Sequence, residues 1–66
     1  MATPEEIEET LAIIREAWCK APMLRLGQLL SNSALIAEWP KTDLFYLEDA
    51  QLKYGLEKFI KGIKVL

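Results

Sequence analysis

Apolar residues recur at helical spacing in three segments of the chain. In the first segment they follow one another at intervals of four, three and four residues: Ile7, Leu11, Ile14 and Trp18. This spacing is typical of one face of an amphipathic α-helix. Thr3 as N-cap, Pro4 in the first turn and Glu6 three residues after the cap form a capping-box start. The helix is expected to end before Pro22, because the residue before a proline avoids helical angles.

The other two segments complete an all-α pattern. Residues 24–38 are apolar around most of a helical circumference, which predicts a central helix that ends at Trp39-Pro40. Residues 41–43 read as a turn, and the following DLFYLED stretch (43–49) as a tight turn or linker whose Leu44, Phe45 and Leu47 fill the core. A third helix is expected from residue 48 or 49, with apolar positions at Leu52, Leu56, Phe59, Ile60 and Ile63. Gly62 either caps it or is followed by an extension through Val65 and Leu66.

Length and composition favour an oligomer. A chain of 66 residues buries only about 60% of the surface that its unfolded form exposes. The single cysteine, Cys19, excludes an internal disulfide, and the absence of histidine excludes the usual structural zinc sets within one chain. Hydrophobic residues nevertheless make up 52% of the chain. We therefore expect one domain, residues 1–66, that forms a small helical bundle of three helices with a short connector, completed by homo-oligomerisation.

Charge and missing motifs exclude several functions. A net charge of -2 and a pI near 5.0 argue against binding to duplex nucleic acid, which depends on Lys and Arg. No apolar run reaches the length of a membrane span and the acidic start is unlike a signal peptide, so a cytoplasmic protein is expected. Without histidine, Ser-His and Cys-His catalytic pairs are excluded, and Cys19 is interpreted as a packing thiol. We expect no enzyme, no cofactor and no metal.

Polar residues interrupt the second helix in the stretch RLGQLLSN (25–32). On a helical wheel the core arc is Leu26, Leu30, Ser33, Ala34 and Ala37, while a second arc carries Arg25, Gln28 and Asn32. Leu29, Leu35 and Ile36 flank this polar arc, so its side chains are expected to be partly desolvated and to need hydrogen-bond partners. Gly27 is expected to mark the close approach of another helix, or alternatively of a ligand to the first turn.

Three interpretations of the polar arc remain open. In the first, Arg25 pairs with Glu48 or Asp49, and Gln28 and Asn32 bind the backbone of the connector. In the second, the arc is a self-association surface whose polar groups fix the register. In the third, it lines a ligand pocket: Arg25 holds a phosphate or carboxylate, Gln28 and Asn32 read polar edges, and an aromatic ring stacks on the ligand. The candidate stacking residues are Trp39, Phe45 and Tyr46.

The stretches RLGQLLSN and DLFYLED together resemble a group of short uncharacterised bacterial and phage proteins. The resemblance covers about the middle half of the chain and implies a phage-type setting, although it brings no established activity. It leads to the hypothesis of a non-enzymatic homo-oligomer that sequesters a small anionic, nucleotide-derived signalling ligand and so suppresses a host defence. The alternative is an adaptor or inhibitor that docks on a host protein through an apolar helical surface.

Overall fold

The computed structural model describes residues 1–40 and 43–62, which contain three helices, and thereby confirms the all-α prediction. α1 spans Pro4–Lys20. Its capping box is present as expected: the Glu6 N–H donates to Thr3 Oγ1 at 3.1 Å, and the Thr3 N–H donates to Glu6 Oε1 at 2.8 Å. Ala21 caps the other end, directly before Pro22.

α2 spans Leu26–Ile36 and α3 spans Asp49–Ile60, so the second helix is shorter at both ends than predicted. After α2 the chain turns through Glu38, which adopts a left-handed conformation with φ of 63°. The N–H of Trp39 donates to the carbonyl oxygen of Ala34 and that of Glu38 to Leu35, both at 2.9 Å. This pattern is a Schellman motif, in which glycine is the usual left-handed residue.

Gly62 ends α3 in a similar way, with φ of 96° and an N–H that donates to the Phe59 carbonyl oxygen at 3.0 Å. The capping alternative for Gly62 is therefore confirmed. The predicted turn at residues 41 and 42, the apolar position Ile63 and the extension through Val65 and Leu66 lie outside the described residues.

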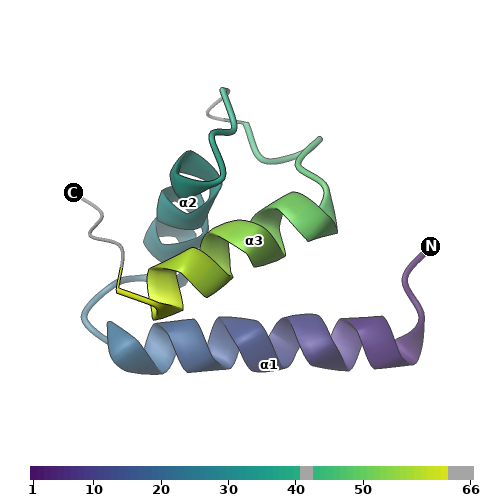
Figure 1. The fold of residues 1–66 in the computed structure, drawn as a ribbon, viewed down its shortest axis with the longest axis horizontal. Coiled ribbons are helices and arrows are strands. Elements are labelled where there is room, and N and C mark those ends of the chain that lie inside the picture. The colour runs from purple at the N-terminus through teal and green to yellow at the C-terminus, as the bar shows by residue number, and fades with distance from the viewer. Residues whose placement is uncertain (41–42, 63–66) are drawn as a thin grey trace.

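α3 lies between the other two helices and packs against both, whereas α1 and α2 touch each other only slightly (Figure 1). The core is centred on Ala17 of α1, Leu29 of α2 and Leu56 of α3, all fully buried. α2 and α3 cross at Gly55, where an added Cβ would lie 1.9 Å from the Ser33 carbonyl oxygen. Only glycine allows this approach of two backbones.

The predicted core arc of α2 is correct in part. Ser33 and Ala34 are buried, but Leu26 is exposed because it lies at the first position of the helix. Leu29, expected beside the polar arc, is instead fully buried. The Ser33 hydroxyl donates to the Leu29 carbonyl oxygen at 2.8 Å, which satisfies it within its own helix.

Within the described residues, no helix has the length and apolar character that crossing a membrane requires.

Candidate functional site

The start of α2 uses two of the predicted site residues for capping. Arg25 is the N-cap, and its backbone N–H donates to Gln28 Oε1 at 2.8 Å. Both side chains are exposed, so the expectation that they are partly desolvated is wrong: the helix turns this arc outward at its first turn. The Gln28 amide binds the beginning of its own helix rather than the connector. Asn32, one turn further on, is half-buried.

Gly27 does not mark a close approach among the described residues. A Cβ added there would meet no heavy atom within 4 Å, so the predicted helix contact at Gly27 is wrong. The close approach occurs at Gly55 on α3 instead, a glycine to which the sequence pattern gives no such role. Among the same residues one ion pair forms, between Lys53 and Glu9, so the predicted pairing of Arg25 with Glu48 or Asp49 is not made.

The three predicted stacking residues lie in the connector between α2 and α3. The Trp39 indole Nε1 donates to the Asp43 carbonyl oxygen at 2.9 Å, and the Phe45 N–H donates to Asp43 Oδ1 at 2.9 Å. The rings of Phe45 and Tyr46 meet edge to face, with centroids 4.8 Å apart. We call residues 43–47 the aromatic turn.

The aromatic turn presents its rings to solvent. Phe45 is 81% exposed and Tyr46 68% exposed. The prediction that Phe45 fills the core is therefore wrong, whereas Leu44 and Leu47 are half-buried. A tight turn, closed by the hydrogen bond from the Leu47 N–H to the Leu44 carbonyl oxygen at 3.0 Å, leaves Phe45 and Tyr46 exposed between these two half-buried leucines.

The predicted site residues form two groups that one chain does not bring together. Arg25 and Gln28 lie at the first turn of α2, and the aromatic turn follows its last turn. The 11 residues of α2 separate the groups by about 16 Å at 1.5 Å per residue. In Figure 1 the C-terminal end of α2 points away from α1, and the connector follows this end.

A third feature, not predicted as a site, lies on α1. A groove of about 510 Å³ is lined by Leu11, Ile14, Arg15, Trp18, Cys19 and Pro22; we call it the α1 groove. The Trp18 indole Nε1 donates to the Leu24 carbonyl oxygen at 2.8 Å, which fixes the ring at the end of the groove. Cys19 is exposed, so its interpretation as a packing thiol is wrong.

The α1 groove continues along the apolar stripe that the sequence marks. Ile7 is 47% exposed, Leu11 48% and Trp18 37%. The burial of Ala17, with Ile13 and Ile14 packed beside it, shows that α3 covers the neighbouring side of α1, and Ile14 lies at the boundary of the two sides, half-buried in one chain. The 4-3-4 spacing therefore marks a face that one chain leaves half uncovered.

Two charged groups of the described residues have a shifted pKa, and both take part in hydrogen bonds within the fold. No three His, Cys, Asp or Glu residues among them lie close enough together to hold a metal ion. Lys53 Nζ donates to Glu9 Oε1 at 2.8 Å, and this hydrogen bond raises the pKa of Lys53. The hydrogen bond from the Thr3 backbone lowers the pKa of Glu6. Lys53 joins α3 to α1 through Glu9, and Glu6 belongs to the capping box of α1.

The exposed aromatic turn and the α1 groove are thus two surfaces of the described residues that could bind a partner. The polar start of α2 adds an exposed cation, Arg25, which directly follows Leu24 and its hydrogen bond to Trp18. Comparison of the chain with protein-family models, with curated proteins and with solved structures gives no match.

Proposed function

We propose that the protein is a non-enzymatic, cytoplasmic, homo-oligomeric binding protein that docks on a partner protein through its aromatic turn. The observation that carries this proposal is the exposure of Phe45 and Tyr46 on a turn held by hydrogen bonds at Trp39, Asp43 and Leu47. Aromatic side chains of this kind dominate the energy of many protein interfaces. A turn that is already ordered loses little conformational entropy on binding.

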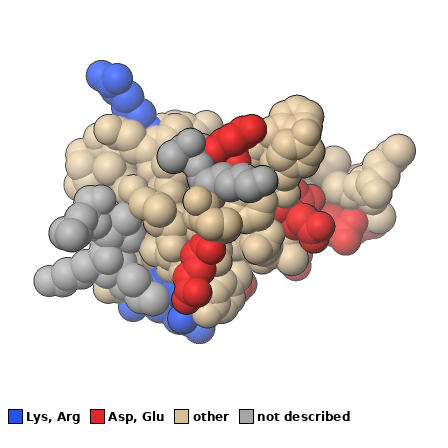
Figure 2. All heavy atoms as spheres, turned by 90° about the horizontal axis from the view of Figure 1, so that it is seen from above, with Lys and Arg blue, Asp and Glu red and all other residues tan. Residues whose placement is uncertain are grey.

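Charge defines the chemistry of the partner. Asp43, Glu48 and Asp49 flank the aromatic pair, and residues 43–49 contain no Lys or Arg. Figure 2 shows acidic groups across the middle and right of the face at this end of the molecule, with basic groups at its upper left and along its lower edge. A complementary partner surface therefore has an apolar pocket for the rings with Lys or Arg residues around it.

The test is capture of a partner by immobilised protein, followed by titration calorimetry with the partner so identified. The double variant Phe45→Ala/Tyr46→Ala should lose binding, and its circular dichroism should be unchanged because both rings lie outside the core. Leu35→Ala is the matched control, since Leu35 is also an exposed apolar residue but lies on α2. Equal binding by the wild type and the double variant would contradict the proposal.

The small anionic ligand remains the second candidate. Arg25 and the aromatic turn are both exposed but lie at opposite ends of α2, so a site that uses both needs Arg25 from one chain and the rings from another. Calorimetric titration of cyclic di- and trinucleotides should then give binding that Arg25→Ala abolishes while helical content survives. Absence of binding to the wild type would remove this candidate and, with it, the proposed sequestration of a nucleotide signal in a phage-type setting.

A further inference from the structure

We infer that α1 pairs with α1 of a second copy of this chain, antiparallel and across a two-fold axis, through the stripe Ile7, Leu11, Ile14 and Trp18. The inference rests on the proposed homo-oligomer and specifies the surface that forms it. It is independent of the aromatic turn, which lies on the connector between α2 and α3. One copy leaves this stripe about half exposed at Ile7 and Leu11.

The spacing of the stripe fits helix pairing. Intervals of four, three and four residues are those of a and d positions in a coiled-coil heptad, where each side chain enters a gap on the facing helix. Antiparallel pairing about an axis between residues 12 and 13 places Ile7 against Trp18 of the second copy and Leu11 against its Ile14. The two outer layers thus each pair Ile7 with Trp18, and the two inner layers each pair Leu11 with Ile14.

The hollows on α1 fit the same arrangement. Leu11, Ile14 and Trp18 line the α1 groove, and Ile7 and Leu11 line a smaller depression of about 190 Å³ nearer the N-terminus. Pairing about the axis between residues 12 and 13 places Ile7 of the second copy at the α1 groove of the first copy, beside the first copy's Trp18. It places Trp18 of the second copy at the depression. The hydrogen bond from Trp18 to Leu24 holds the indole in place before association.

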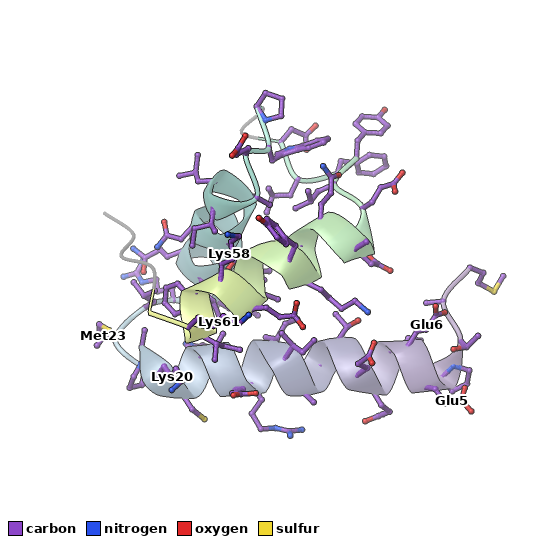
Figure 3. All side chains as sticks on the ribbon, in the orientation of Figure 1. Glu5, Glu6, Lys20, Met23, Lys58 and Lys61 are labelled. Carbon is purple, nitrogen blue, oxygen red and sulfur yellow. The ribbon has the colours of Figure 1, made fainter. Side chains whose placement is uncertain are left out.

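Charge selects the antiparallel orientation. Figure 3 shows Glu5 and Glu6 at one end of α1 and Lys20 at the other. A parallel pair would bring like charges together, whereas an antiparallel pair brings each acidic end to the basic end of the other copy.

One charged pair lies directly beside the stripe. Glu8 follows Ile7 and Arg15 follows Ile14, so both border the same edge of the stripe. The stated axis brings Glu8 of each copy next to Arg15 of the other. Within its own helix Arg15 has only apolar neighbours three and four residues away: Leu11, Ala12, Trp18 and Cys19. In the proposed pair, Glu8 of the second copy therefore supplies Arg15 with an opposite charge that these four neighbours do not.

The first test is sedimentation velocity of the full chain and of Leu11→Glu over a wide range of concentration. The wild type should associate, and Leu11→Glu should weaken association roughly a hundredfold, because a carboxylate would have to be desolvated at the centre of the pair. Ala12→Glu is the matched control: it adds the same charge to the next exposed position of α1, on the side away from the stripe, and should associate like the wild type.

The outcomes separate this inference from the proposed oligomer. A wild type that stays monomeric would overturn both. A wild-type oligomer that Leu11→Glu leaves intact would overturn the α1 surface alone. Circular dichroism is expected to show that Leu11→Glu keeps its helices, since Leu11 is half exposed in one chain. Ile7→Glu, also half exposed, is the second variant and should repeat the loss.

The second test addresses orientation by charge reversal. Glu8→Arg and Arg15→Glu should each weaken association roughly tenfold, because exposed ion pairs contribute about 0.2–1 kcal/mol each and the symmetry doubles the effect. The double variant Glu8→Arg/Arg15→Glu restores opposite charges between the copies and should associate like the wild type. A double variant weaker than either single variant would overturn the antiparallel arrangement.

Discussion

Gly55→Ala is expected to separate α2 from α3 and to destabilise the protein strongly. The added Cβ would lie 1.9 Å from the carbonyl oxygen of Ser33, where real contacts are at least 3.0 Å. The obstacle is backbone, so the helices must part locally by about 1 Å. Overpacking of this kind costs about 1–3 kcal/mol, and parting the helices also loosens the packing around Leu29 and Leu56.

The gain in helix propensity from Gly to Ala, about 1 kcal/mol, offsets only part of this cost. We expect a net loss of up to about 2 kcal/mol in the free energy of unfolding from these two effects, and more from the loosened packing around Leu29 and Leu56. This loss is large for a chain whose total is roughly 3–10 kcal/mol. Urea unfolding followed by circular dichroism, at fixed chain concentration, measures it.

Gly27→Ala provides the control, because it makes the same substitution where a Cβ meets nothing within 4 Å. It should leave stability unchanged or raise it by up to about 1 kcal/mol. If Gly55→Ala were as stable as Gly27→Ala, the crossing of α2 and α3 at Gly55 would be wrong.

Three further predictions concern the helix ends and the one ion pair of the described residues. Thr3→Ala should lower the free energy of unfolding by about 1 kcal/mol in urea titrations, because it removes the hydroxyl that accepts from the Glu6 N–H. The backbone N–H of residue 3, which this variant keeps, lowers the folded-state pKa of Glu6; the stability from that bond is present above the unfolded pKa and is lost as the pH falls through the folded value, so Glu6→Gln should lose less stability in acid than the wild type. Glu38→Gly should raise the free energy of unfolding by about 0.5–1 kcal/mol in urea titrations, since glycine adopts the left-handed conformation without strain; a lower midpoint would contradict the Schellman geometry. The raised pKa of Lys53 means that its bond to Glu9 stabilises the fold below the unfolded pKa of lysine and is lost as the pH rises through the folded value, so thermal melts above pH 10 should show a smaller alkaline loss in Glu9→Gln than in the wild type.

Local signals predicted the helix boundaries well. The capping box at Thr3 and the proline at position 22 define α1, and Gly62 ends α3, because caps depend on a few neighbouring residues. The end of α2 is harder to predict from the sequence, because the left-handed residue that follows it is Glu38 rather than glycine. α2 is therefore shorter than its apolar pattern suggests.

The spacing of apolar residues could not show which face of each helix is buried and which is exposed. On α1 two overlapping sets of apolar residues have helical spacing, and only the position of α3 shows that Ala17 is buried while Leu11 is half exposed. The same limit applies to Gly27 and Gly55, whose different roles depend on a neighbouring helix. The predicted grouping of Arg25 with the aromatic residues requires them to lie near the same end of α2, whereas Arg25 precedes this helix and the aromatic turn follows it.

The order of the helices along the chain has a consequence for synthesis in the cell. α3 is the last of the three to leave the ribosome, yet it is the one that contacts both others. While α1 and α2 are emerging, their apolar residues have little to pack against except each other, so this period is when the nascent chain is most open to chaperones and to aggregation. Packing of the three helices therefore follows the translation of residue 60, and a slow codon placed before α3 would prolong the exposed state.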